Sequence, residues 1–558
     1  MVSAHRLSAA VPRRRFGMAL ASAWAAAVAL LGLWLSQAIA ASPAETILRQ
    51  LQAGAGVPAT ERNATDLALL AGFYKERQER LWVTDRGATP RAHQLASILQ
   101  NADQDGLDPD DYGATAIAAL LDATGPDALA ELELRLSLGL IQFISDLASG
   151  RVEPSEVDPE LFVYPQDIDH AAVIRAAADA SDLDTFVAGF RPAQDEYQRA
   201  RAALAEFRAR AARGDDWGVV PEGPTLDPGM TDPRIAWLRA RLLASSDAEE
   251  ARLAAVGAAA PEFYDHALEA AVRRFQYRHG LEQDGRVGRR TIEALNVPIE
   301  QRIRQIVLNL ERRRWMPDDR GERYVFVNLA DFELKLVDGP RTVFDTRVVV
   351  GAPYHRTPVF SAEMTYVEIN PYWNVPPSIA RNELLPEIKA DPGYLAANGF
   401  ELLTGWDNGA AIDPWTIDWS RIGPENFAWR LRQKPGASNA LGRIKFMFPN
   451  RFNVYLHDTP ARHLFDRAER SFSHGCIRVE QPVTFGAFVL AGQDDWSRER
   501  LEAAIASGER MIVPLEKPLP VHIAYLTAWV NKDGTVHFRN DVYGRDTRLA
   551  AALLGPRA

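Results

Sequence analysis

The spacing of apolar residues changes once along this chain, close to Trp315. Before that position, apolar side chains recur at intervals of three and four residues, a pattern that predicts helices. After it, β-branched and aromatic residues gather in short segments bounded by glycine and proline, which predicts strands. The 558 residues suffice for roughly three to four domains. We therefore expect a multidomain protein, helical in its first part and mostly β in its second.

The composition is that of an ordinary globular protein and excludes several classes. Hydrophobic residues make up 47% and charged residues 25%, so the chain is neither disordered nor fibrous. The net charge of -11 makes it a poor non-specific binder of nucleic acid, which requires clustered positive charge. Its single cysteine, Cys476, excludes a disulfide framework and a metal site built from several cysteines. We expect no metal and no cofactor.

Residues 1–40 have the layout of an export signal. Three arginines, residues 13–15, precede an uncharged apolar run that ends in Ala38-Ile39-Ala40, a small-x-small cleavage pattern. The run borders on the length that spans a bilayer, so an uncleaved membrane anchor is the alternative. The arginines also resemble a twin-arginine signal. We expect a periplasmic protein that contacts the cytoplasmic membrane only through this segment, if the segment is uncleaved.

Residues 41–220 are predicted to form an α-helical scaffold domain. Alanine, leucine, arginine and glutamate dominate this stretch, and an apolar row at helical spacing runs from Leu136 to Leu147 before Gly150 ends it. No combination of residues in this part indicates catalysis. The segment of residues 214–224 is rich in glycine and proline, which predicts a linker to the next domain.

Residues 224–297 are predicted to form a small domain of three helices. Apolar residues at helical spacing are followed by an ordered series of turn residues. This order resembles the three-helix peptidoglycan-binding domain, which implies an accessory domain near the cell wall. The same apolar positions also suit a plain helical bundle. A connecting helix is expected over residues 298–320. The segments that resemble the domain are Arg274-Phe275-Gln276, His279-Gly280-Leu281, Asp284 to Gly288, and Thr291.

In the segment of residues 452–457, apolar side chains alternate strictly with side chains that carry a polar group. In a strand, its first, third and fifth residues lie on a core face. Asn453, Tyr455 and His457 then lie together on the opposite face. The pattern therefore predicts a phenol and an imidazole side by side.

The only cysteine follows His457 by 19 positions, in Ser473-His474-Gly475-Cys476. If a strand starts at the cysteine, Cys476 and Arg478 share a face, and the apolar residues between and after them face the core. An imidazole can take the proton of a nearby thiol and leave a nucleophilic thiolate. Gly475 permits a tight turn, so backbone N–H groups around it and Cys476 could bind a developing oxyanion. Arg478 offers a fixed charge for a substrate carboxylate.

His457 together with Ser473-His474-Gly475-Cys476 is similar to the signature of the L,D-transpeptidase (YkuD-type) catalytic domain. Many of these enzymes have asparagine two positions after the cysteine. This chain has Arg478 there, as the large multidomain YcbB-type branch does, and it resembles that branch over nearly its whole length after the signal. The further matching stretches are VVVG (348–351), TPV (357–359), NPYWNVPPSI (370–379), PG (435–436), NALGRIKF (439–446), FPN (448–450), YLHDTP (455–460) and PVHIAYLTAW (520–529).

The resemblance implies a function and a role for each residue. Cys476 is the nucleophile, and His457, oriented by a neighbouring backbone carbonyl, is the general base and later the acid. The enzyme would attack a donor tetrapeptide stem of peptidoglycan, release D-Ala and form a 3→3 cross-link between diaminopimelate residues. Carbapenems would acylate it. Ser473 and His474 are expected to shape the loop, and Tyr455 to contact substrate or simply to pack.

The resemblance also implies a mostly β, YkuD-like catalytic domain at residues 321–515, followed by a C-terminal β extension at residues 516–558. Residues 377–442 differ in composition, with four tryptophans and several glycines and prolines. This stretch is expected to be an inserted capping subdomain. Its tryptophans belong either to a lid over the site or to a small core of its own.

Two other classes of function remain open. A zinc-dependent hydrolase could use His457, His463, His474 and Cys476, although no usual zinc-ligand spacing is present. A non-catalytic scaffold that binds the cell wall would leave the cysteine inert. Expected partners are peptidoglycan stem peptides and other proteins of cell-wall synthesis, and not nucleic acid.

Overall fold

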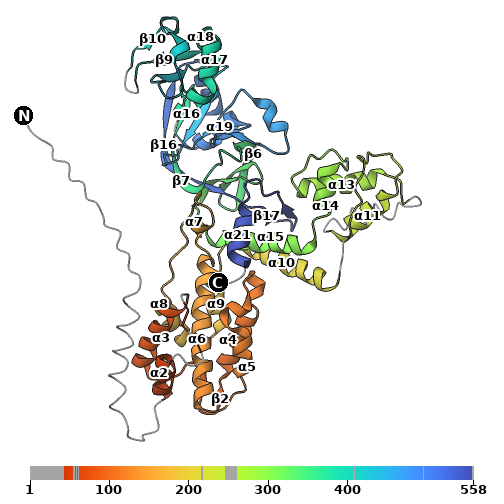
Figure 1. Cartoon of the computed structure of the whole chain (residues 1–558), viewed down its shortest axis with the longest axis vertical. Coiled ribbons are helices and arrows are strands. Elements are labelled where there is room, and N and C mark those ends of the chain that lie inside the picture. Colours follow the sequence, from red (N-terminus) through yellow and green to blue (C-terminus); the bar gives the residue numbers. More distant parts are fainter. Residues whose placement is uncertain are drawn as a thin grey trace, which may run out of the picture. The chain divides into compact units, whose positions relative to one another are not determined.

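The structure is a computed structural model of the chain (Figure 1). The export signal expected at residues 1–40 lies outside the residues it describes. Within the described ranges, no helix is long and apolar enough to cross a membrane. The described residues are 43–53, 57, 59–60, 62–214, 218–245, 261–405, 409–493 and 495–555.

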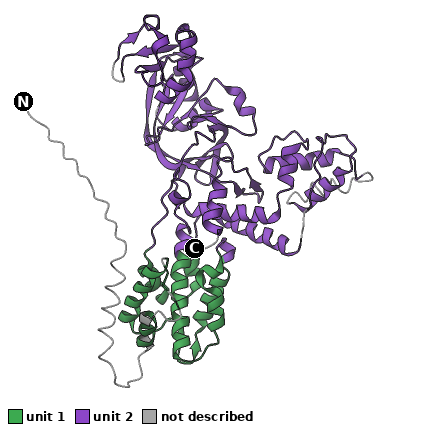
Figure 2. Ribbon diagram, viewed as in Figure 1, with its two compact units in different colours: residues 1–102, 108–144, 169–188 green, residues 103–107, 145–168, 189–558 purple. Residues whose placement is uncertain are grey.

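The chain divides into two compact units, coloured separately in Figure 2. One unit comprises residues 1–102, 108–144 and 169–188, and the other comprises residues 103–107, 145–168 and 189–558. The range predicted for the scaffold, 41–220, therefore contributes to both units. Helix α10 (Asp195–Ala212) lies in the larger unit and packs against the connecting helix α15 (Ile299–Arg314).

The smaller unit is helical, as expected. Its helix α6 (Pro126–Ser149) presents the buried Glu133 to the chain before the short hairpin β1–β2. The Glu133 carboxylate accepts the N–H groups of Trp82 (2.8 Å) and Val83 (3.0 Å) and the Tyr74 hydroxyl (2.8 Å). Burial raises the pKa of Glu133 although these bonds oppose the rise. The remaining elements are α2 (Pro43–Ala53), α3 (Ala64–Arg77), β1 (Val83–Thr84), β2 (Gly87–Ala88), α4 (Pro90–Gln100), η2 (Pro109–Tyr112), α5 (Ala114–Leu120), α8 (His170–Asp179) and α9 (Leu183–Ala188).

Among the described residues of the second domain predicted from the sequence, there are three helices: α11 (Arg234–Ala244), α13 (His266–Arg278) and α14 (Arg289–Leu295). Their apolar faces meet in a separate core that includes Leu238, Phe275 and Leu295. The buried Gln276 holds the following turn, because its side chain accepts the Gly285 N–H (2.9 Å) and donates to a backbone carbonyl. The hydrogen bonds of the Gln276 side chain thus explain why turn residues follow α13 in this order.

The catalytic part is built on one large sheet with the strand order β12-β13-β15-β6-β5-β4-β16-β7-β3. Because β12 also pairs with β7, the sheet closes on itself. Its apolar interior is the largest core of the protein. The strands are β3 (Leu161–Phe162), β4 (Arg323–Asn328), β5 (Glu333–Asp338), β6 (Arg341–Gly351), β7 (Val359–Ile369), β12 (Ile444–Met447), β13 (Leu456–His457), β14 (Ser471–Ser473), β15 (Ile477–Val479) and β16 (Met511–Ala524).

The final segment is only partly β. Strand β16 passes through residue 515, the expected end of the catalytic domain, and pairs with β7 before that residue and with both β7 and β4 after it. A two-stranded hairpin, β17 (Ala528–Val530) and β18 (Val536–Phe538), follows. The chain then forms helix α21 (Arg545–Leu554), which the expectation of a β extension missed. Helices α19 (Pro482–Leu490) and α20 (Arg498–Ala506) precede β16.

The insertion expected at residues 377–442 folds around a small core of its own. Trp419 is buried in that core and Trp429 packs against it, whereas Trp415 is exposed. Trp406 lies outside the described residues. The elements of the insertion are α16 (Pro377–Ile379), the π-helical turn η3 (Ala380–Leu384), α17 (Leu385–Ala390), α18 (Gly393–Ala397), β9 (Phe400–Leu403), β10 (Ala411–Ile412), η4 (Pro414–Thr416), η5 (Trp419–Arg421) and β11 (Arg430–Gln433). Strand β8 (Trp373–Asn374) joins the sheet of the insertion.

Candidate active site

The register of three neighbouring strands aligns the side chains of the site. On β13, His457 lies opposite Lys445 of β12 and opposite Arg478 of β15. Residues directly opposite each other in a sheet point to the same face. Cys476 lies two residues before Arg478, and the Cys476 thiol interacts with the Tyr455 hydroxyl and backbone N–H. Tyr455, His457, Cys476 and Arg478 are therefore neighbours, as predicted.

The expected strand at residues 451–457 is wrong in its first half. Only Leu456 and His457 are in a strand, and Asn453 has a positive φ of 54° that a continuous strand does not permit. The cause is Asn450, whose side-chain oxygen accepts the N–H groups of Phe452 (3.0 Å) and Val454 (3.2 Å) and so holds a turn. The apolar residues of the segment nevertheless face the core.

His457 is buried and has a defined tautomer. Its Nδ1 lies 2.5 Å from the backbone carbonyl of Asp458. A carbonyl only accepts hydrogen bonds, so Nδ1 carries the proton and Nε2 is left without one. Burial lowers the pKa of His457 to about 3, and the nearby charges of Arg478 and Lys445 act in the same direction. The ring is therefore neutral near pH 7 and able to accept a proton at Nε2.

Cys476 is half-buried, and its thiol donates to the Asn453 carbonyl at 3.7 Å. Burial raises the pKa of Cys476, while the Tyr455 contacts and the positive charges of Lys445 and Arg478 oppose that rise. The resting cysteine is thus a protonated thiol beside a neutral imidazole.

Hydrogen bonds on both sides fix the loop that carries the nucleophile. Ser473 Oγ accepts the Gly475 N–H (3.1 Å) and donates to the Cys476 carbonyl (2.5 Å). On the other side, Thr357 Oγ1 donates to the Gly475 carbonyl (2.8 Å) and accepts the Gly351 N–H (3.0 Å). Gly475 has a φ of 103°, which favours glycine. Ser473 and Gly475 thus shape the loop.

The predicted oxyanion site is smaller than expected. We expected N–H groups around both Gly475 and Cys476 to be available, but the Gly475 N–H is bound by Ser473. In the part of the chain that the structure describes, the Cys476 N–H makes no hydrogen bond. That N–H, adjacent to the nucleophilic sulfur, is therefore the free donor.

His474 contacts the capping subdomain. Its Nε2 lies 2.6 Å from a carboxylate oxygen of Glu383 on η3, and its ring lies 4.7 Å from that of His355. The two partners carry opposite charges only when His474 is protonated. Because Glu383 belongs to the insertion, this contact joins the insertion to the nucleophile loop. The insertion thus has its own core and also contacts the site.

The zinc alternative finds no ligand set in the described ranges. No group of three or more histidine, cysteine, aspartate or glutamate side chains there converges as metal ligands would. His463 lies exposed on η6 (Arg462–Asp466), as expected for a solvated loop. The residues named for zinc are therefore divided between the catalytic face, the capping contact and the surface.

Sequence reasoning assigned no role to Lys445 or Thr357. Lys445 alternates with the buried Ile444 and Phe446, and this alternation could have placed it on the face of His457. Thr357 lies far from the cysteine in sequence, so only the fold shows that it holds Gly475. Arg478 was predicted, and its Nε is buried without a hydrogen-bond partner in the described part of the structure.

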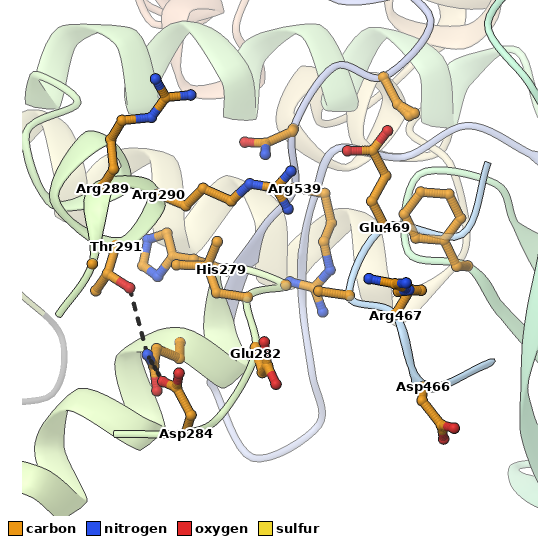
Figure 3. Close-up of a pocket in the computed structure, with 18 of the residues that line it drawn as sticks. His279, Glu282, Asp284, Arg289, Arg290, Thr291, Asp466, Arg467, Glu469 and Arg539 are labelled. Atoms are coloured by element: carbon orange, nitrogen blue, oxygen red, sulfur yellow. Dashed lines mark hydrogen bonds between the residues drawn. The ribbon is translucent and has the colours of Figure 1, made fainter. Parts of the chain in front are cut away.

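A separate cavity of about 1080 Å³ lies on another part of the larger unit (Figure 3). It is lined from three directions: by the end of α13 and the start of α14, by the segment that leads into β14, and by residues after β18. Figure 3 shows Arg290, Arg539 and Arg467 around it, together with Glu282 and Glu469. Cys476 and His457 do not line it. The cavity is therefore separate from the site that contains Cys476 and His457.

Three family models match the chain. Residues 322–499 match "L,D-transpeptidase catalytic domain", residues 234–295 match "Putative peptidoglycan binding domain" and residues 68–204 match "Scaffold domain". The chain therefore contains an L,D-transpeptidase catalytic domain, preceded by a peptidoglycan-binding domain and a scaffold domain. The observed fold agrees: helices in the first two regions and a β-rich catalytic region.

A curated relative supports the same class. The protein named "Putative L,D-transpeptidase" of Haemophilus influenzae is 35% identical over 269 residues, which are 47% of this chain and 53% of the relative. The chain thus spans about half the length of that relative. A crystal structure of an L,D-transpeptidase from Xylanimonas cellulosilytica matches with 15% identity and a TM-score of 0.18, over 54% of this chain and 98% of that one. A TM-score this low does not establish a common arrangement of strands.

Proposed function

We propose that this protein is a peptidoglycan L,D-transpeptidase that forms 3→3 cross-links between diaminopimelate residues through an acyl-enzyme on Cys476. The observation that carries the proposal is the combination of Cys476 with a buried, neutral His457 on one face of the catalytic sheet. The catalytic-domain match covers both residues. The peptidoglycan-binding domain supports peptidoglycan as the substrate.

In the first half of the reaction, His457 Nε2 takes the thiol proton and Cys476 Sγ attacks the carbonyl carbon between diaminopimelate and the terminal D-Ala. The carbonyl oxygen of the tetrahedral intermediate becomes negative and accepts a hydrogen bond from the Cys476 N–H. The C–N bond then breaks, the D-Ala amine leaves with the proton from His457, and a thioester remains. The free N–H and the oriented imidazole supply the two groups required.

In the second half, the side-chain amine of an acceptor diaminopimelate attacks the thioester carbon. His457 takes a proton from this amine and the C–S bond breaks, so that the new amide forms and the thiol is restored. Arg478 binds a substrate carboxylate, which its partnerless buried Nε supports. The insertion caps this site through its contact with His474, and Tyr455 lines it.

The proposed function also implies a cellular location and partners for the protein. It acts in the periplasm on peptidoglycan stem peptides, with other proteins of cell-wall synthesis, and contacts the cytoplasmic membrane only through its N-terminal segment. Carbapenems acylate Cys476. These statements rest on the catalytic-domain and peptidoglycan-binding matches together with the export-type segment in the sequence.

A muropeptide assay tests the proposal. The exported form is incubated with a disaccharide tetrapeptide that ends in D-Ala, and the products are identified by tandem mass spectrometry. We expect free D-Ala and a dimer joined between two diaminopimelate residues, and neither product from Cys476→Ala. A folded protein that binds sacculi but releases no D-Ala would instead be a non-catalytic wall-binding scaffold.

A further inference from the structure

Lys445 is a cation on the catalytic face that no step above uses. It lies on β12, with Ile444 and Phe446 on either side of it in the core. The strand register places it opposite His457 on one side and opposite Glu368 of β7 on the other. Its ammonium lies 4.0 Å from the centre of the Tyr455 ring. It is therefore held within the site and is not a mobile surface lysine.

The charge of Lys445 is not neutralised by a direct partner. Glu368, its neighbour on β7, is bound 2.6 Å from Arg510. Among the described residues, the ammonium of Lys445 forms no hydrogen bond or ion pair. A lysine held over an aromatic ring keeps its charge while its direction is fixed. Cys476 is one of the groups whose charge acts on Lys445, and its thiol contacts the same Tyr455.

We propose that Lys445 is a positioning residue of this enzyme: its ammonium, fixed on the Tyr455 ring, stabilises the Cys476 thiolate. It never exchanges a proton with substrate and acts only through the charge of the sulfur. The inference rests on Cys476 being the nucleophile of the proposed function.

The electrostatics of the site agree with this role. The positive charge of Lys445 opposes the rise that burial causes in the pKa of Cys476, and Arg478 acts in the same direction. Burial lowers the pKa of Lys445 itself, whereas Glu368 and Cys476 raise it and Arg510 lowers it. Lys445 also helps to keep His457 neutral. The groups that face it are thus Glu368, Arg510, His457, Tyr455 and Cys476, with Arg478 beyond them.

The test measures the rate of alkylation of Cys476 by iodoacetamide as a function of pH. The thiolate sulfur displaces iodide and forms a thioether, so the rate reports the thiolate fraction and needs no peptidoglycan substrate. Replacing Lys445 by methionine should move the midpoint of the profile upwards by about 1 pH unit, which means about tenfold slower alkylation below the midpoint. Measurement in the His457→Ala background removes any contribution from the imidazole.

Matched variants separate charge from structure. Lys445→Arg keeps the charge and should restore the profile, whereas Lys445→Gln should behave like Lys445→Met. Lys517→Met removes an exposed lysine of β16 and should leave the profile unchanged. A profile of folded Lys445→Met or Lys445→Gln that coincides with that of the parent would overturn the inference. If the parent forms acyl-enzyme normally in that case, the proposed function stands and only the role of Lys445 falls.

Discussion

At the scale of single residues, the neutral ring of His457 carries its proton on Nδ1, which donates to the backbone carbonyl of Asp458. The positive charges of Lys445 and Arg478 lie near this ring. These surroundings keep the imidazole unprotonated in the resting enzyme, so Nε2 is free to accept a proton, but they also lower its affinity for that proton. They also suit a subsequent acid, because an imidazolium formed during the reaction gives its proton up readily. Burial and charge therefore tune the histidine for both halves of the proposed reaction.

The depressed pKa of His457 predicts a specific dependence of stability on pH. In the unfolded chain, the histidine titrates near the ordinary value of about 6.5. Between that value and its folded pKa of about 3, the unfolded state binds more protons than the native state, so stability rises with pH. The stability that neutral His457 contributes is complete above about pH 6.5 and is lost as pH falls towards 3.

Thermal melting of the parent and of His457→Gln between pH 4 and pH 7.5 checks this. We expect the difference in their unfolding free energies to shrink as the medium becomes acidic, by about 1.4 kcal/mol per pH unit at most. Other buried histidines, such as His537 and His279, are present in both proteins and cancel in the comparison. A difference that stays constant across the range would mean that His457 titrates normally.

Most of the site could be predicted from residue types, and the exceptions have physical reasons. The prediction that Cys476 and His457 share a face follows from alternation in two short segments, and the strand register places Arg478, two residues after Cys476, opposite His457. The blocked Gly475 N–H could not be predicted, because a serine two residues earlier can bond in several ways. Lys445 received no role because its value depends on which strand lies beside β12, a property of the whole sheet.

At the scale of structural elements, the loop from β14 to β15 positions the nucleophile, and the segment after β6 supports it. Thr357 is wholly buried and joins the Gly351 N–H to the Gly475 carbonyl through one hydroxyl. The Gly351 backbone passes so close to residues 355–357 that an added Cβ would lie 2.1 Å from the His355 carbonyl oxygen. This tight turn explains why the sequence there is rich in glycine and proline.

Replacing Thr357 by valine should loosen the nucleophile loop. The change preserves size but leaves one buried donor and one buried acceptor without partners, at a cost of about 1–3 kcal/mol. We expect lower thermal stability and slower acylation of Cys476, measured by melting and by the time course of adduct formation. Thr357→Ser keeps the hydroxyl and serves as the control. Equal acylation rates for the valine variant and the parent would show that the loop does not depend on this bond.

The elements themselves were predicted unevenly. Strands β4, β5 and β6 lie after Trp315, where the sequence predicts strands because β-branched and aromatic residues gather in short segments. Strand β16 instead continues to Ala524, past residue 515, where the catalytic domain was expected to end. Its three prolines and its charged residues obscured the strand pattern, and long-range pairing with β4 and β7 overrides them.

At the scale of the whole molecule, segments distant in sequence complete the catalytic unit. Strand β3, from the range predicted for the scaffold, pairs with β7 of the catalytic sheet. The neighbouring Asp158 has a fully buried side chain that contacts Arg356 (3.0 Å), Arg545 (3.4 Å) and Arg548 (2.7 Å). Burial raises the pKa of Asp158, but its bond from the Glu160 N–H and the three arginines hold it below the ordinary value.

Asp158→Asn should destabilise this unit strongly. It removes the buried carboxylate charge that contacts all three arginines and leaves Glu160 to pair with Arg356 and Arg545 alone, at a cost of about 3 kcal/mol or more. Limited proteolysis near α21 and thermal melting measure the effect. Asp167→Asn, an exposed aspartate of the same segment, is the matched control and should change neither. If both variants melt like the parent, the cluster does not hold the C-terminal helix in place.

The domain order could be predicted from the change in apolar spacing and from turn residues. The compact unit to which each segment belongs could not be predicted. Residues 145–168 continue the composition of the helices before them, yet they belong to the unit of the catalytic sheet. Such membership depends on contacts between positions hundreds of residues apart, such as those of Arg545 with Asp158. Local patterns do not contain this information.

The most direct test of the central claim is the intact mass of the exported protein after incubation with a carbapenem, measured beside Cys476→Ala. The account predicts one adduct on the parent, mapped by peptide sequencing to Cys476, and no adduct on the variant. An unmodified, folded parent, or an adduct that persists in Cys476→Ala, would contradict a Cys476 acyl-enzyme.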